Sequence, residues 1–185
     1  KDYMLNLVDT PGHVDFSYEV SRSLMAVEGA ILLVDAGKGI QAQTLANLDL
    51  AKKQNLTIIP VVNKIDLPQA DVEVCIKELA ELLNIPKEAI LKISGKNGTN
   101  VIQLLDEVIK QVPKPKEENA TKPLRALIFD SIYDSYKGVI AYVRIIDGGV
   151  KKTDKLKLLV ADIDFEIKQL GYFNPELVEQ DKLSA

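Results

Sequence analysis

Cysteine, tryptophan and histidine are nearly absent from this sequence of 185 residues, which has one cysteine, no tryptophan and one histidine. Because Cys75 stands alone, no internal disulfide can form and no cysteine cluster can hold zinc. No apolar run approaches the roughly 18 residues that cross a bilayer. The longest, residues 31–34 and 58–62, have the length of strands. The sequence therefore predicts no transmembrane segment, and no signal peptide opens it.

Charge of one sign is not in large excess either. The net charge is -4, with 27% charged and 46% apolar residues. This balance excludes disorder driven by low hydrophobicity and high charge. It also excludes nucleic-acid binding that depends mainly on bulk positive charge, although a basic groove on an acidic body stays open.

Strand-like and helix-like segments alternate along the first 113 residues. Short runs rich in Val, Ile and Leu predict buried parallel strands at residues 3–9, 30–35, 57–63 and 89–94. Between them, apolar residues recur at helical spacing after Phe16, Gln41, Asp71 and Val101, and Asp71 is a plausible N-cap. Strands that alternate with helices indicate an α/β fold with a parallel sheet.

A polar, proline-containing segment follows this α/β part. Its composition is typical of a linker, which we place at residues 114–123. Beyond it, shorter segments predict strands at residues 124–132, 138–146, 155–160 and 164–170. Asp147-Gly-Gly149 predicts a hairpin turn between two of them. The sequence thus predicts two domains, residues 1–113 and 124–185, the second a small antiparallel β-barrel.

The first motif with chemical meaning, Asp9-Thr-Pro-Gly12, directly follows a predicted strand. Ligands bind at the carboxyl ends of parallel strands. Asp9 could hold a magnesium ion through water, because hard cations prefer carboxylate oxygens. Gly12 would let a backbone N–H approach a phosphate closely. Taken alone, the motif is weak evidence of function and is better explained as a strand followed by a Pro-Gly turn.

Two further motifs follow later strands of the same predicted sheet. In Asn63-Lys64-Ile65-Asp66, the Asp66 carboxylate can accept two hydrogens from guanine, and the Lys64 stem can cover a flat base. In Ser94-Gly95-Lys96, a backbone N–H can donate to guanine O6, and Lys96 can cover the other face of the ring. Each motif alone could also be a loop with solvated charges.

Together, three motifs in this order resemble the third, fourth and fifth signature motifs of the GTPase G domain. His13, directly after Gly12, resembles the translational GTPases. Residues 14–24, 41–47 and 126–131 further resemble the LepA family of translation factors, also called elongation factor four. The resemblance implies a partial P-loop GTPase G domain, with its first strands missing, followed by an incomplete β-barrel of the domain II type.

The same resemblance implies the roles of individual residues. His13 would position the attacking water, since phosphoryl transfer depends mainly on positioning and charge stabilisation. GTP or GDP and magnesium are the implied cofactors, with magnesium assisted by Asp9. The residues implied in nucleotide binding are Asp9, Gly12, Asn63, Lys64, Asp66, Ser94, Gly95 and Lys96.

The implied partner of the parent protein is the ribosome, with its RNA and proteins and with tRNA left open. The family is linked to back-translocation and to the fidelity of protein synthesis. The implied location is the cytoplasm, with peripheral membrane association left open, or the mitochondrial matrix or plastid for an organellar protein. Two alternatives remain: another translational GTPase, of the elongation factor G or BipA type, or a non-catalytic ribosome-binding module with vestigial nucleotide binding.

The sequence departs from the family pattern in two places. Gly95 stands where family members usually have Ala, and no Gly-x-x-x-x-Gly-Lys-[Ser/Thr] loop occurs in the chain. In this family that loop, its strand and the switch-one threonine lie before the residue numbered Lys1, so we expect a piece of a longer protein that is inactive alone. We expect residues 3–9 to pair directly with residues 30–35, or a partner to fill the gap, because open strand edges are costly.

Overall fold

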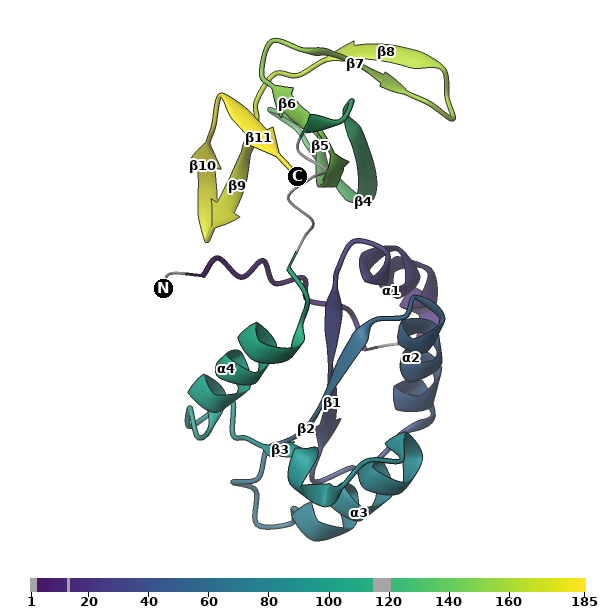
Figure 1. The fold of residues 1–185 in the computed structure, drawn as a ribbon, viewed down its shortest axis with the longest axis vertical. Coiled ribbons are helices and arrows are strands. Elements are labelled where there is room, and N and C mark those ends of the chain that lie inside the picture. Colours follow the sequence, from purple (N-terminus) through teal and green to yellow (C-terminus); the bar gives the residue numbers. More distant parts are fainter. Residues whose placement is uncertain (1–2, 13, 115–120) are drawn as a thin grey trace. The chain divides into compact units, whose positions relative to one another are not determined.

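The computed structural model describes residues 3–12, 14–114 and 121–185 of the chain (Figure 1). The chain divides into two compact units, residues 1–114 and residues 115–185. None of the helices within the described ranges is long and apolar enough to cross a bilayer.

The first unit is built on a three-stranded parallel sheet with strand order β1-β2-β3. Strand β1 (Gly29–Asp35) pairs with β2 (Thr57–Asn63) from Gly29 beside Thr57 to Asp35 beside Asn63. Strand β3 (Leu91–Lys92) extends the sheet beyond β2. The predicted parallel α/β sheet is confirmed, and its last strand is much shorter than the predicted residues 89–94.

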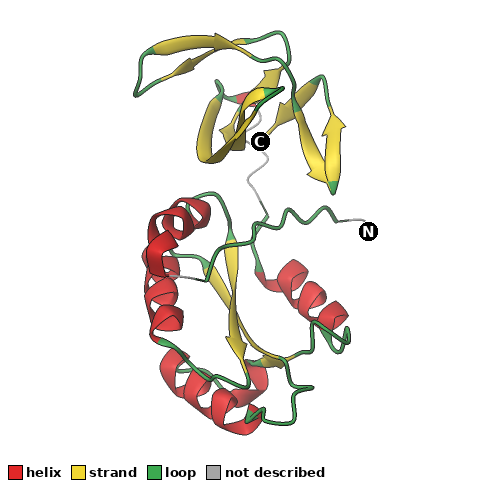
Figure 2. Ribbon diagram, turned by 180° about the vertical axis from the view of Figure 1, so that it is seen from behind, coloured by secondary structure: helices red, strands yellow, loops and turns green. Residues whose placement is uncertain are grey.

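Helices cover both faces of this sheet (Figures 1 and 2). Helices α1 (Ser17–Leu24), α2 (Ala42–Lys53) and α3 (Val72–Leu83) lie on one side, and α4 (Val101–Gln111) lies on the other. Two short 3₁₀ turns span Val14–Phe16 and Lys87–Ala89. As predicted, Asp71 caps α3: its Oδ1 accepts a hydrogen bond of 3.2 Å from the Val74 backbone N–H.

The central strand β2 is buried on both faces, which explains its continuous apolar sequence. On one face, Val62 packs in a cluster with Ile76 and Leu79 of α3. On the other face, Val61 packs with Leu104 of α4. The two clusters fix β2, and with it the loop that follows Asn63, relative to the helices.

Residues 3–12 form no strand, so the predicted strand at residues 3–9 is wrong. Met4 and Leu7 are 72% and 84% exposed rather than buried. The expected direct pairing with β1 is also wrong, because within the described residues β1 pairs only with β2. An extended segment gains backbone hydrogen bonds only from a neighbouring strand, so residues 3–9 stay irregular without one.

The second unit consists of antiparallel strand pairs, as predicted. Strand β4 (Arg125–Asp134) pairs with β5 (Gly138–Asp147), and β7 (Lys155–Leu158) pairs with β8 (Ile163–Glu166). The remaining pairs join β9 (Gly171–Asn174) to β10 (Glu176–Glu179), and β6 (Gly149–Lys151) to β11 (Lys182–Ser184).

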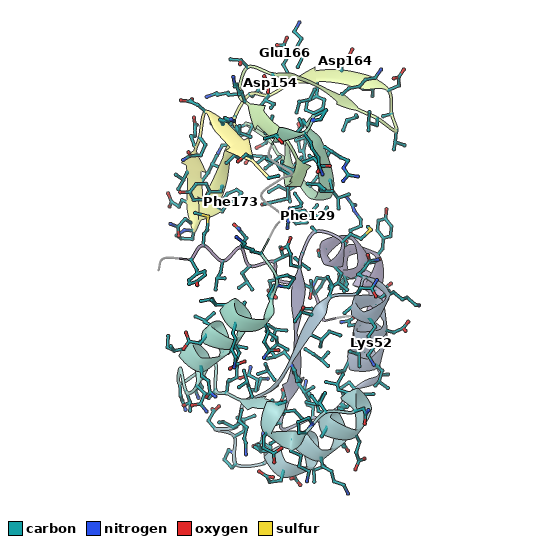
Figure 3. The ribbon with its side chains drawn as sticks, in the orientation of Figure 1. Lys52, Phe129, Asp154, Asp164, Glu166 and Phe173 are labelled. Carbon is teal, nitrogen blue, oxygen red and sulfur yellow. The ribbon has the colours of Figure 1, made fainter. Side chains whose placement is uncertain are left out.

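Aromatic side chains link two of these strand pairs. The Tyr142 ring of β5 lies 6.4 Å from Phe129 of β4 and 5.7 Å from Phe173 of β9, measured between ring centroids. Phe129 and Phe173 are labelled in Figure 3. Tilted ring pairs at such distances stabilise beyond their buried area, so Tyr142 holds the β9–β10 pair against the β4–β5 pair.

The hairpin predicted at Asp147-Gly-Gly149 is wrong, because β6 pairs with β11 instead of folding back on β5. Gly148 has φ +70°, and a Cβ there would lie 2.4 Å from the Lys122 carbonyl oxygen. Gly148 therefore lies where two chain segments cross and only glycine fits, rather than in a two-residue turn.

Candidate functional site

The site lies at the carboxyl end of the parallel strands. Asp35 and Asn63 end neighbouring strands and are paired in the sheet register. The Ala36 N–H donates to the Asn63 carbonyl oxygen at 2.9 Å, which extends this pairing past the strand ends. Loops that carry polar side chains therefore start side by side, where ligands bind in open α/β sheets.

Asn63 joins two of these loops through one side-chain atom. Its Oδ1 accepts hydrogen bonds from the backbone N–H of Lys64 at 2.7 Å and of Gly95 at 3.0 Å. A Cβ added to Gly95 would lie 3.6 Å from the same oxygen, which is ordinary contact. The structure therefore has room for the alanine that the resemblance led us to expect, and Asn63 holds the loop at residues 94–96 beside its own.

Ser94 makes a second link between the same loops. Its hydroxyl donates to Asp66 Oδ1 at 2.6 Å, and it accepts a hydrogen bond of 3.1 Å from the Asn97 N–H. Ser94 is only 1% exposed, so its hydroxyl is fixed among protein groups. The hydrogen bond from Ser94, aided by the charges of Lys96 and Lys64, lowers the pKa of Asp66 below its ordinary value despite partial desolvation. Asp66 is therefore ionised at neutral pH and acts only as an acceptor.

Lys64 contacts a residue that the sequence analysis did not single out. Its Nζ lies 2.7 Å from Asp35 Oδ2, and the hydrogen bond from Lys64 is the largest cause of the lowered pKa of Asp35. The position of Asp35 could have indicated this contact, because Asp35 ends the predicted strand at residues 30–35 and Lys64 directly follows the next predicted strand. Lys64 has φ +63°, unusual for a residue with a side chain.

Hydrogen bonds thus bring together five of the predicted residues. Asn63 accepts from the N–H groups of Lys64 and Gly95, and Ser94 donates to Asp66. Lys96 stands next to Gly95 in the exposed loop and contributes charge toward Asp66. An ionised carboxylate next to two lysine stems can accept paired N–H groups from a flat heterocycle and cover its faces. That combination suits guanine.

The phosphate-side residues are not brought to this cluster. Asp9 and Gly12 lie in the exposed irregular segment, and His13 lies outside the described residues. Asp9 therefore does not end a strand, contrary to prediction. In the part of the chain that the structure describes, no group of three or more His, Cys, Asp or Glu residues could hold a metal ion. Among the described residues, the cluster around Asp66 fits the base of a nucleotide, and Asp9 and Gly12 lie outside that cluster.

Lysines cluster near β7, where they could form an exposed, solvated strand face or contact RNA phosphates, and three of them have an acidic neighbour. Lys152 pairs with Glu179 at 3.3 Å, and Lys155 pairs with Glu166 at 3.6 Å. Lys157 pairs with Asp162, which has φ +55° and lies in the turn between β7 and β8. These ion pairs favour the exposed strand face.

Comparison with known proteins agrees with this geometry. Residues 1–114 match the family described as the elongation factor Tu GTP binding domain. Curated relatives named elongation factor 4 include those of Dehalococcoides mccartyi strain CBDB1, 54% identical over all 185 residues, and Micrococcus luteus, 53% identical over 184 residues. The chain spans about 30% of the length of these relatives.

Solved structures of translation factors share the fold. The bacterial selenocysteine-specific elongation factor EF-Sec superposes with a TM-score of 0.75 and 26% identity, over 96% of this chain and 31% of that chain. Elongation factor SelB of Methanococcus maripaludis, solved with the GTP analogue GppNHp, gives a TM-score of 0.77 at 22% identity, over 96% and 40% of the two chains.

The fold and the site thus define a GTP-binding domain of a translation factor followed by antiparallel strands, and the chain belongs to the elongation factor Tu GTP-binding domain family. Within that class, the resemblance to elongation factor 4 is confirmed across both units and is favoured over the elongation factor G and BipA alternatives.

Proposed function

We propose that this chain is part of a ribosome-dependent GTPase of translation elongation, of the LepA type, and that the cluster around Asp66 reads guanine. The observation that carries the proposal is the hydrogen bond from Ser94 to Asp66 together with the Asn63 link to Gly95. These hydrogen bonds hold the two loops side by side before any nucleotide binds. The identity of 50–54% to proteins named elongation factor 4 supports the same function.

Guanine would be selected by charge and donor pattern. An ionised Asp66 can accept both the N1–H and the 2-amino group of guanine, whereas adenine offers neither at those positions. The Ser94 hydrogen bond occupies Asp66 Oδ1 from one side, and a carboxylate has about four acceptor sites in total. Capacity for two more hydrogen bonds therefore remains.

Nucleotide binding by a full-length protein that contains this chain tests the proposal. The wild type should prefer GTP over ATP by roughly 10⁴-fold, as sites built on a hydrogen-bonding pattern do. Asp66→Asn should lose GTP affinity and gain affinity for xanthosine triphosphate, whose C2 carbonyl accepts from the new amide. Recovered binding of xanthosine triphosphate is also the control for an intact fold. Unchanged GTP binding in Asp66→Asn would remove Asp66 as the guanine reader.

For the phosphate side, we infer the roles from the family resemblance. Gly12 would donate its N–H to the γ-phosphate, Asp9 would assist magnesium, and His13 would position the attacking water. Bound magnesium supplies charge neutralisation for the leaving phosphate oxygens. The 185-residue chain alone carries no phosphate-binding Gly-rich loop, so we expect it to bind GTP far more weakly than the full-length protein. Micromolar binding by the chain alone, with normal magnesium dependence, would contradict this expectation.

We further infer a G domain at residues 1–113, a linker at 114–123 and a β-barrel domain at 124–185. The division into compact units after residue 114 supports these bounds; residues 115–120 of the linker lie outside the described residues. The proposed partner is the ribosome, with a site of action in the cytoplasm or in an organelle matrix.

A further inference from the structure

We propose that Asp35 is a positioning residue for guanine-nucleotide binding, because its carboxylate holds the ammonium of Lys64 and thereby fixes the stem that covers the base. The inference rests on the proposed function of the same site. It concerns a residue outside all three signature motifs, which reaches the site only through the pairing of β1 with β2.

The Asp35 backbone is fixed by a turn. Its carbonyl oxygen accepts hydrogen bonds from the N–H groups of Lys38 at 3.0 Å and Gly39 at 2.9 Å. Its side-chain Oδ1 accepts from the Gly37 N–H at 2.9 Å. With the backbone and one carboxylate oxygen engaged, the second oxygen, Oδ2, has a defined direction, and that direction is toward Lys64 Nζ at 2.7 Å.

Lys64 needs such a partner. Its side chain is 52% exposed, and a free lysine side chain has many accessible rotamers, which are lost when the side chain is ordered. A base that stacks on an unrestrained stem must order that stem itself, which weakens binding. Because Asp35 holds the ammonium in the unbound protein, part of this ordering is complete before the nucleotide arrives.

The ion pair contributes little to folding. Ion pairs in which one partner is largely exposed contribute little to stability, because solvent screens them and the side chains lose entropy. The Lys53–Asp49 pair on α2 has the same length, 2.7 Å, and is more exposed still. What distinguishes Asp35 is its place: the sheet register sets it beside Asn63, whose side chain accepts from the Lys64 N–H. Lys64 is thus held at both its backbone and its ammonium.

The test is a double-mutant cycle on GDP binding, measured by stopped-flow fluorescence on a full-length protein that contains this chain. Asp35→Asn keeps an oxygen for the Gly37 N–H and removes only the charge. We expect GDP affinity to fall roughly two- to fivefold, the range for exposed ion pairs, mainly through faster dissociation. Raising the salt concentration should shrink the difference from the wild type.

Lys64→Met keeps an apolar stem and removes the ammonium. If Asp35 acts through that ammonium, Asp35→Asn should have no further effect in the Lys64→Met background. A merely structural role of Asp35 in the turn would persist in that background. Asp49→Asn is the matched control, because it breaks an equally short ion pair of the same unit and should leave GDP binding unchanged.

The outcomes separate the two proposals. If the wild type showed no preference for guanine nucleotides, the proposed function and this inference would both fail. If the wild type preferred guanine but Asp35→Asn bound GDP like the wild type, or lost equally in both backgrounds, only the role of Asp35 would be overturned. If Asp35→Asn failed to fold, GDP binding by Lys64→Met would be the test. Lys64→Met removes the ammonium through which Asp35 acts, so wild-type GDP affinity in that variant would overturn the inference.

Discussion

The Ser94 hydroxyl donates a hydrogen bond of 2.6 Å to Asp66 Oδ1 across 28 residues of sequence. This contact joins two motifs that follow different strands, and it connects a buried group to a partly exposed one. Ser94, which is buried, fixes the position of the Asp66 carboxylate. The exposed side, Asp66, keeps its charge and faces the lysines of the same loops.

Ser94→Ala should reduce stability in a pH-dependent manner. The folded state lowers the pKa of Asp66, so the stability from this carboxylate is present above the ordinary value of 3.8 and is lost as pH falls through the lower folded value. The loss caused by Ser94→Ala should therefore be larger at pH 7 than at pH 3. Urea unfolding at both pH values measures it.

The matched control for this comparison is Ser23→Ala. Ser23 is also buried, in α1, and it is not a cause of any shifted pKa found among the described residues. Its effect on stability should be the same at pH 7 and pH 3. A Ser94→Ala penalty equally independent of pH would show that the hydrogen bond does not stabilise the charged form of Asp66.

Leu79→Ala should destabilise the first unit strongly. Leu79 is fully buried between α3 and the sheet, and removing a buried leucine side chain typically costs about 2–5 kcal/mol in lost burial and cavity formation. On the same helix, Val74 is 47% exposed, so Val74→Ala should change the free energy of unfolding by less than about 0.5 kcal/mol. Urea titration followed by far-UV circular dichroism compares them.

Gly148→Ala should destabilise the second unit. A side chain at φ +70° costs about 1–2 kcal/mol, and the new Cβ would also collide with the Lys122 carbonyl oxygen. Gly138 separates the two effects, because it has φ +83° and a Cβ added there would meet nothing within 4 Å. Gly138→Ala should therefore show only the backbone cost. Peptide-resolved hydrogen exchange of the second unit distinguishes the variants, and equal effects would argue against the collision.

His13→Ala in a full-length protein should keep GTP affinity and lose ribosome-stimulated hydrolysis. A side chain that positions the attacking water matters in the transition state and little in the ground state. The rate should fall by roughly 10²–10⁴-fold, the size of typical proton-transfer and positioning effects. Single-turnover experiments with and without ribosomes measure the hydrolysis rate, and equilibrium titration measures the GTP affinity. Parallel loss of affinity and rate would assign His13 a structural role.

Several features could be read from the sequence because short-range pattern determines them. The apolar run at Thr57–Asn63 predicted a strand buried on both faces, and Asp71 predicted the start of α3. The motifs ending in Asp66 and beginning at Ser94 predicted a shared loop region, since parallel strands place their carboxyl ends at one edge. Residue type and spacing suffice for such predictions.

Other features were decided by tertiary contacts. Residues 3–9 have the composition of a strand, yet they form none because no neighbouring strand satisfies their backbone. Asp147-Gly-Gly149 has the composition of a hairpin turn, yet the crossing at Lys122 and the pairing of β6 with β11 direct the chain elsewhere. Asp35 reaches Lys64 only because the sheet register sets β1 beside the end of β2. The sequence alone determined which residues have the right chemistry; long-range pairing decided which of them meet.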